Sequence, residues 1–252
     1  MIDVKDVSKN YGSKQVITEV RLPIKEKQLT AFIGPNGAGK STLLSMISRL
    51  IEIDAGEIYL DHNEVKAWRS NELSKKLSIL KQSNGLSLRI TVRELVSFGR
   101  FPYSKGRLNQ ADHQLIDHAL DKLGLTEMAE DTIDTLSGGQ LQRAYIAMIL
   151  AQDTEYILLD EPLNNLDMNY AVQLIQTLRR LVDEEQKTIL LVIHDINFAA
   201  SYADEIVAMK AGQIFAHGTT EEMIQCSVLN PLYEMNVKIC ELEGKRFCMY
   251  FN

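Results

Sequence analysis

The sequence contains no apolar run that approaches the roughly 18 residues needed to cross a bilayer. Its first residues, Met1–Asp6, alternate apolar with charged side chains, which is not the pattern of a signal peptide. We therefore expect a chain that does not enter a membrane by itself. If it works at a membrane, another chain must hold it there.

Cysteine and positive charge are also scarce. The three cysteines, Cys226, Cys240 and Cys248, are odd in number and lack metal-site spacing, so we expect free thiols in a reducing cytosol. Acidic residues outnumber basic ones by 34 to 27, and the net charge of −7 disfavours nucleic-acid binding. There is no internal repeat or low-complexity segment. The 252 residues allow one large α/β domain or a core with an inserted subdomain.

The clearest motif is a glycine-rich loop between a short apolar run, Leu29–Ile33, and a segment with helical apolar spacing. This order predicts a phosphate-binding loop, in which backbone N–H groups and a helix N-terminus face phosphate oxygens. Lys40 is expected at the β- and γ-phosphates and Ser41 at Mg²⁺. The alternative is a plain glycine-rich turn. The loop consists of Gly34, Pro35, Asn36, Gly37, Ala38, Gly39, Lys40, Ser41 and Thr42.

Strands are predicted on both sides of this loop. Residues 1–30 read as strands joined by polar turns, and Tyr11 at a strand end either stacks on adenine or simply packs. Residues 56–61 favour an edge strand. The strand at 77–80 ends next to Gln82, which either reaches a metal ion or the attacking water, or is merely solvated.

Helical patterns dominate residues 86–152. Thr91 and Glu94 form a capping-box motif that opens a helix, and residues 99–108 are expected to be loop. One acid, Glu94, lies among five basic residues, which form either a solvated face or a contact surface for a partner. These basic residues are Arg89, Arg93, Arg100, Lys105 and Arg107.

A second anion-binding motif follows this region. It consists of Ser137, Gly138, Gly139 and Gln140 at the start of a helical run, about 100 residues after the first loop. The alternative, for the motif taken alone, is a helix N-cap with a flexible preceding turn. Together with the loop at 34–42, this segment gives the chain two places where backbone N–H groups can face an anion.

Two apolar strands end in polar side chains. The strand at 156–160 ends in Asp160 and Glu161, which suit the Mg²⁺ shell and the polarisation of a water molecule; the alternative is two exposed loop acids. The strand at 188–193 ends in His194, which could contact a γ-phosphate or be structural. Asp167 leads into an amphipathic helix. A strand pair at 205–217 and a terminal hairpin around Gly244 complete the chain, and we assign the hairpin no chemistry.

The order of these motifs resembles that of the nucleotide-binding subunits of ABC transporters. The match includes the loop at 34–42, Gln82, the LSGGQ segment at 136–140, the strand at 157–162, Asp167 and His194. The resemblance implies an α/β fold with a P-loop NTPase (RecA-like) core, an antiparallel β subdomain and an inserted α-helical subdomain. It implies an ABC ATPase domain at 1–225, with helices inserted at about 86–152, and a C-terminal β-hairpin extension at 226–252.

The same resemblance implies a head-to-tail homodimer with ATP between the phosphate loop of one copy and the LSGGQ segment of the other. Tyr11 would stack on adenine, and Asp167 would lie at the nucleotide. Lys40 would neutralise phosphate charge, while Ser41, Gln82 and Asp160 would arrange Mg²⁺. Glu161 would act as general base, and His194 would align the γ-phosphate and water.

Within the family, the chain resembles importers of iron siderophores, haem and vitamin B12, on the segments 91–103 and 194–200. The segments SRLIEIDAGEIYLD, VSFGRFPYSKGRL and DEPLNNLDMN are similar to ATPases of Gram-positive ferric catecholate-siderophore importers of the petrobactin type. Such a subunit lies at the cytoplasmic face of the cell membrane. Its partners are permease subunits, contacted through the basic region 89–107, and indirectly an extracellular substrate-binding protein, with no nucleic acid.

One departure from the family pattern is Leu163, where Thr or Ser is usual. Three rival functions remain. A DNA-repair or chromosome ATPase is disfavoured because no long coiled coil separates the two loops. A translation factor is disfavoured because the chain is acidic and has one cassette. An exporter, or an importer of haem, vitamin B12 or metal, is disfavoured only by resemblance.

Overall fold

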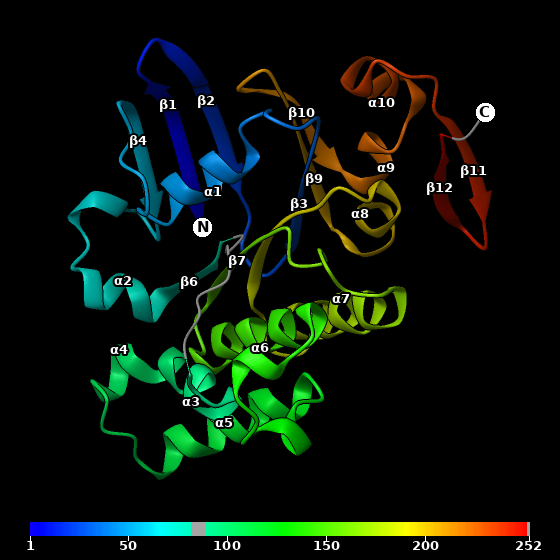
Figure 1. Cartoon of the computed structure of the whole chain (residues 1–252). Helices are drawn as coiled ribbons and strands as arrows, with labels where there is room; N and C mark the ends of the chain where they lie inside the picture. The colour runs from blue at the N-terminus through cyan, green and yellow to red at the C-terminus, as the bar shows by residue number, and fades with distance from the viewer. Residues whose placement is uncertain (82–88, 251–252) are drawn as a thin grey trace.

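The computed structural model describes residues 1–81 and 89–250 (Figure 1). A six-stranded sheet with the order β10-β9-β3-β8-β7-β6 forms its centre, and only β10 runs antiparallel to its neighbour. Every residue of β3, β7 and β8 is buried, as expected for parallel strands covered on both faces. The strands are β3 (Leu29–Ile33), β6 (Leu77–Leu80), β7 (Tyr156–Asp160), β8 (Thr188–Val192), β9 (Glu205–Lys210) and β10 (Gln213–Thr219).

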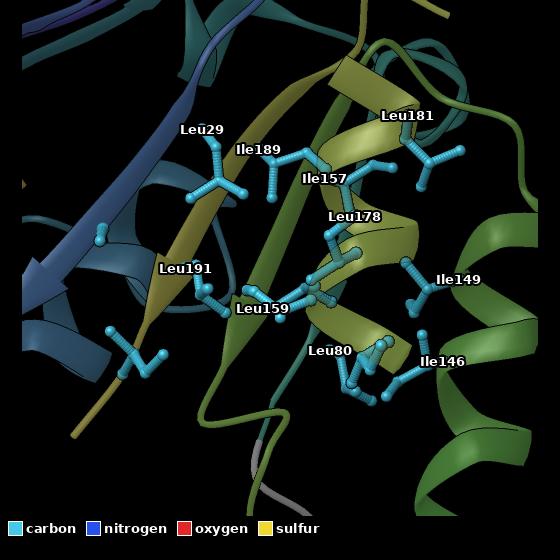
Figure 2. Packing of buried hydrophobic residues seen from close by; sticks show 14 of the residues in the cluster. Leu29, Leu80, Ile146, Ile149, Ile157, Leu159, Leu178, Leu181, Ile189 and Leu191 are labelled. Carbon is cyan, nitrogen blue, oxygen red and sulfur yellow. The ribbon is translucent and has the colours of Figure 1, made fainter. Parts of the chain in front are cut away.

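Alternate residues of the central strands enter two separate cores. Phe32 packs with α1 (Lys40–Ile47) and the antiparallel sheet, whereas Ala31 and Ile33 pack with α6 (Gly138–Ala151), α7 (Met168–Asp183) and α8 (Ile196–Tyr202). Figure 2 shows side chains of β7 directed toward α7 and α6. The phosphate-loop helix α1 and the helix α6 therefore cover opposite faces of the sheet (Figure 1).

The antiparallel sheet has the strand order β2-β1-β4-β5. The expected edge position of the strand at 56–61 was wrong, because Asn63 and Glu64 turn back and pair with Leu60 and Tyr59. The strands are β1 (Ile2–Tyr11), β2 (Lys14–Ile24), β4 (Ala55–Leu60) and β5 (Asn63–Glu64), followed by the short helices η1 (Val65–Ala67) and α2 (Ser70–Lys76).

Most of residues 92–151 are helical, and Thr91 and Glu94 form the expected capping box. The expected loop at 99–108 was wrong in its first half. Residues 98–104 are helical, Pro102 lies in a first turn, where its missing N–H costs nothing, and Lys105 ends the turn at φ 50°. The elements are α3 (Val92–Ser97), η2 (Phe98–Arg100), α4 (Phe101–Ser104), α5 (Gln110–Lys122), η3 (Thr126–Met128) and η4 (Ile133–Thr135).

The C-terminal part contains the expected hairpin, formed by β11 (Lys238–Leu242) and β12 (Lys245–Met249). Two helices that were not predicted, α9 (Thr220–Met223) and α10 (Cys226–Tyr233), precede it. The three cysteines are free thiols. No helix within the described ranges is long and apolar enough to span a membrane. The division of the chain between residues 225 and 226 stays a prediction.

Candidate functional site

The glycine-rich loop connects β3 to α1 and curls over a cavity of about 140 Å³. Residues 36–42 line this cavity together with Val16 and Glu161. Gly34 has φ 135°, and a Cβ there would lie 2.1 Å from the carbonyl oxygen of Met209, so only glycine fits. The N-cap of α1 is Gly39, which has no side chain to occupy the first N–H groups. The helix therefore offers these groups to an anion in the cavity.

Lys40 lies under this loop and is almost fully buried. Its ammonium group donates to the carbonyl oxygens of Gly34 at 2.7 Å and Pro35 at 3.0 Å. Burial lowers the pKa of Lys40, while the carboxylates of Glu161 and Asp160 act in the opposite direction. A buried cation beside the cavity is suited to a ligand with several negative charges.

Asp160 ends β7 and is buried below the loop. Its Oδ1 accepts a hydrogen bond of 2.7 Å from the hydroxyl of Ser41. Burial raises the pKa of Asp160, and the bond from Ser41 counteracts part of that effect. A cation that bound between these two oxygens would favour the charged carboxylate. The pair thus matches the hard oxygen donors that Mg²⁺ prefers.

Glu161 follows directly and has φ 52°, a conformation uncommon for a residue with a side chain. Its Oε1 lies 2.7 Å from Nε2 of His194, and its Oε2 accepts a bond of 2.6 Å from Asn164. The carboxylate lines the phosphate-loop cavity and also a neighbouring cavity of about 230 Å³ that includes His194 and Asn164. It is placed to accept a proton from a water molecule at the boundary between the two cavities.

Asn164 was not predicted as a site residue. Its amide fixes the orientation of the Glu161 carboxylate from the side opposite His194. The only signal in the sequence was its position three residues after Glu161, in a turn that Pro162 begins. Such a signal does not separate a site residue from an ordinary turn residue.

The segment Ser137–Gln140 forms a capping box at the start of α6. The side chain of Gln140 accepts from the N–H of Ser137 at 2.8 Å, and the Ser137 hydroxyl accepts from the N–H of Gln140 at 3.3 Å. A Cβ at Gly139 would lie 3.1 Å from the Asn165 carbonyl oxygen, so the segment packs against the residues that follow β7. The structure does not bring Gly138 and Gly139 to the lining of the phosphate-loop cavity of this chain.

The remaining predicted residues occupy separate places. Tyr11 ends β1 with 49% of its surface exposed, and Nζ of Lys9 lies 5.8 Å from the centre of its ring. Asp167 caps α7 by accepting from the N–H of Tyr170 at 3.0 Å. Gln82 lies outside the described residues. The exposed ring of Tyr11 is available to stack on a base.

The basic region 89–107 is not one positive surface. Arg100 is buried, its Nε donates to Asp112 at 2.9 Å, and its Nη1 donates to the carbonyl oxygen of Ala151 at 3.0 Å. Arg93 pairs with Asp117 and Glu130. The expectation that Arg100 faces a partner was wrong, because its buried guanidinium links η2 to α5 and α6. Two aromatic rings are exposed instead, Phe98 at 52% and Phe101 at 60%.

Comparison with known proteins agrees with this geometry. Residues 17–164 match the family described as ABC transporter. The chain is 54% identical to the petrobactin import ATP-binding protein YclP of Bacillus subtilis (strain 168), with 100% of both chains covered. It is 50% identical to the petrobactin import ATP-binding protein FatE of Bacillus anthracis, over 95% of this chain and 96% of that relative.

A solved dimeric structure of a bacterial ABC transporter cassette superposes with a TM-score of 0.79 at 32% identity. The match covers 87% of this chain and 99% of that chain. These findings confirm the expected fold class, the binding of ATP and the ATPase activity. The chain belongs to the ABC transporter family, as the ATP-binding subunit of an importer.

Proposed function

We propose that the chain hydrolyses ATP with Glu161 as general base. The observation that carries this proposal is the position of its carboxylate, on the wall of the phosphate-loop cavity and fixed between His194 and Asn164. Lys40 and the N–H groups of the loop neutralise and orient the phosphates, and His194 aligns the attacked phosphate with the water. Most of the rate enhancement then comes from positioning and charge neutralisation.

Ser41 and Asp160 are the described residues that would hold Mg²⁺, and Gln82 is the third residue that the family pattern assigns to it. Their oxygen donors, 2.7 Å apart, fit a cation that commonly takes one or two carboxylates together with phosphate oxygens and water. When bound, the ion supplies charge neutralisation at the phosphates. Lys40 lies close to the carboxylates of Asp160 and Glu161, whose negative charges raise its pKa against the effect of burial.

A head-to-tail pair of chains completes the site. The N–H groups of Gly138 and Gly139 begin α6, which makes them suited to phosphate oxygens. They lie beside residues 162–166 and away from the lining of the chain's own cavity. A second copy that presents this segment to the cavity supplies the missing anion contacts, and Asp167 and Tyr11 would then border the same nucleotide.

The test is Glu161→Gln, which keeps the size and shape of the side chain but removes the base. We expect ATP to bind normally and turnover to fall by about 10²- to 10⁴-fold. In the presence of ATP the variant should elute as a dimer, because the trapped nucleotide is not consumed. Wild-type turnover would refute the role of Glu161, and a strictly monomeric variant saturated with ATP would refute the shared site.

Transport of a ferric siderophore, of the catecholate type that petrobactin represents, is the function we assign to this ATPase. Full-length identity to two petrobactin import ATP-binding proteins supports this assignment. The subunit would then work at the cytoplasmic face of the membrane, bound to permease subunits that receive substrate from an extracellular binding protein. Deleting the chain should abolish uptake of the ferric siderophore, and preserved uptake of every iron chelate tested would overturn the assignment.

The permease would contact the surface that carries Phe98, Phe101 and Arg107. All three side chains are exposed, and aromatic and arginine side chains are enriched at protein interfaces. We expect Phe101→Ala combined with Arg107→Glu to reduce co-purification with the permease while ATP affinity stays at the wild-type value. Lys66→Glu, an exposed charge change on η1, is the control, and equal co-purification of both variants would contradict this surface.

A further inference from the structure

The C-terminal segment, residues 226–250, contacts the edge of the nucleotide site at two points. From α10, the hydroxyl oxygen of Tyr233 accepts a hydrogen bond of 3.1 Å from the N–H of Gly34. From β12, the peptide groups of Cys248 bond to the side chain of Asn197 on α8. Figure 1 shows the hairpin lying beside α8. Tyr233, Asn197 and Cys248 are not among the catalytic residues described above.

The first contact fixes the entry of the phosphate loop. Gly34 donates its N–H to Tyr233, and its carbonyl oxygen accepts from Lys40 at 2.7 Å, so one residue links the C-terminal segment to the buried cation. On its other side Gly34 is pressed against the Met209 carbonyl of β9. Burial raises the pKa of Tyr233 to about 12, so its hydroxyl stays neutral and available to accept at neutral pH.

The second contact fixes the segment that follows His194. The Asn197 carboxamide accepts from the Cys248 N–H at 2.8 Å and donates to the Cys248 carbonyl oxygen at 3.3 Å. Asn197 lies in the first turn of α8, where its own N–H is capped by Asp195 at 2.8 Å. Strand β12 therefore fixes the start of α8. His194 lies just before this helix and contacts Glu161.

We propose that the C-terminal segment positions the ATPase site, with Tyr233 setting the first peptide of the phosphate loop and Asn197, bound to Cys248, setting the His194 segment. The proposal rests on the functions assigned above to Lys40 and His194. Tyr233 and Asn197 are positioning residues, since each acts through another group. Because the two contacts reach different parts of the site, their loss should affect different steps.

Tyr233→Phe removes one hydroxyl and leaves Gly34 without its acceptor. We expect the Kd for a fluorescent ATP analogue, measured in EDTA, to rise by about 3- to 10-fold. The turnover number at saturating ATP should stay within about twofold of wild type. Tyr202→Phe is the matched control, because Tyr202 is a half-buried tyrosine on the neighbouring helix α8 that does not bond to the loop, and its Kd should equal that of wild type.

Asn197→Ala releases α8 from β12. We expect the turnover number to fall by about 3- to 10-fold while the KM for ATP changes less than about twofold. Asn230→Ala is the control, because it removes a bond of 2.8 Å from the Val237 N–H to Asn230 within the C-terminal segment without touching α8. Its turnover number should be that of wild type.

A purely structural segment would give another pattern: both variants would lower the urea midpoint of unfolding and leave Kd, KM and the turnover number unchanged, which would overturn the proposal. The same change in KM and turnover for both variants would also overturn it. The proposed function is tested separately: it would fail if Glu161→Gln turned over ATP at the wild-type rate. The ATP affinity of Tyr233→Phe needs no hydrolysis and stays interpretable in that case.

Discussion

The buried ion pair between Arg100 and Asp112 allows a quantitative prediction. The two side chains are 8% and 3% exposed, and Nε of Arg100 donates to Oδ1 of Asp112 at 2.9 Å. Asp112 also accepts from the N–H of Asn109 at 3.0 Å, as part of the capping box of α5. Asp112→Ala would leave a buried guanidinium without its carboxylate and remove one of the two bonds of the capping box. We expect the free energy of unfolding to fall by about 3–5 kcal/mol.

Urea denaturation, followed by circular dichroism without nucleotide, measures this loss. Asp117→Ala is the control, because Asp117 pairs with Arg93 at 2.6 Å but is 58% exposed. We expect the control to lose no more than about 1 kcal/mol. Replacing Arg100 and Asp112 together with leucine should recover most of the loss, since no buried charge is then unpaired. Equal losses for Asp112→Ala and Asp117→Ala would refute the reasoning.

The same pair gives a pH dependence. The bond from the Asn109 N–H, followed by the effect of Arg100, lowers the pKa of Asp112 below its ordinary value, although burial opposes them. A carboxyl whose pKa is lowered on folding contributes stability above its unfolded pKa of about 3.9. This contribution is lost as the pH falls through the folded pKa. The double leucine variant should therefore have a flatter stability profile than wild type below about pH 4.

Two further predictions concern other sites. Gly34→Ala forces a Cβ to within 2.1 Å of the Met209 carbonyl and should lower the free energy of unfolding by about 2–4 kcal/mol. At Gly37 an added Cβ meets no atom within 4 Å, so Gly37→Ala should lower it by only about 1 kcal/mol. Equal urea midpoints for the two variants would contradict this steric account. Glu205 is buried, and the bonds from Lys25 and His217 outweigh burial and lower its pKa. Its contribution is present above its unfolded pKa of about 4.3 and lost as the pH falls, so Glu205→Gln should flatten the acid limb of stability while exposed Glu221→Gln should not.

Local patterns were sufficient to predict the elements whose structure depends on near neighbours. The buried strands at 29–33, 156–160 and 188–192 are continuous apolar runs, and α3 begins at its capping box. Helix α10 was missed because Pro231 lies inside it, where a local rule expects a break. The short helix α4 was missed for a similar reason, since Gly99 and Pro102 suggested a loop.

The contacts of the candidate site depended on tertiary structure and were less predictable. Each motif was visible, but the bond between Glu161 and His194 depends on the pairing of β7 with β8, which places Asp160 opposite Val192. The fate of Arg100 depends on Asp112, which lies 12 residues away on another helix. A count of basic residues cannot distinguish an exposed arginine from one that is buried in an ion pair with a carboxylate on another helix.

The strand order explains why most of the candidate site residues lie at one edge of the sheet and why the segment at 137–140 lies elsewhere. Strands β3, β8 and β7 are neighbours and parallel, so their carboxyl ends bring the phosphate loop, His194 and Glu161 to one edge. The segment at 137–140 comes from α6, which covers one face of the sheet, and it packs against the residues beyond β7. The N–H groups of Gly138 and Gly139 are therefore not part of the lining of the chain's own phosphate-loop cavity. Because such groups stabilise negative charge only within the first turn of a helix, we expect their full effect on turnover to require a second copy.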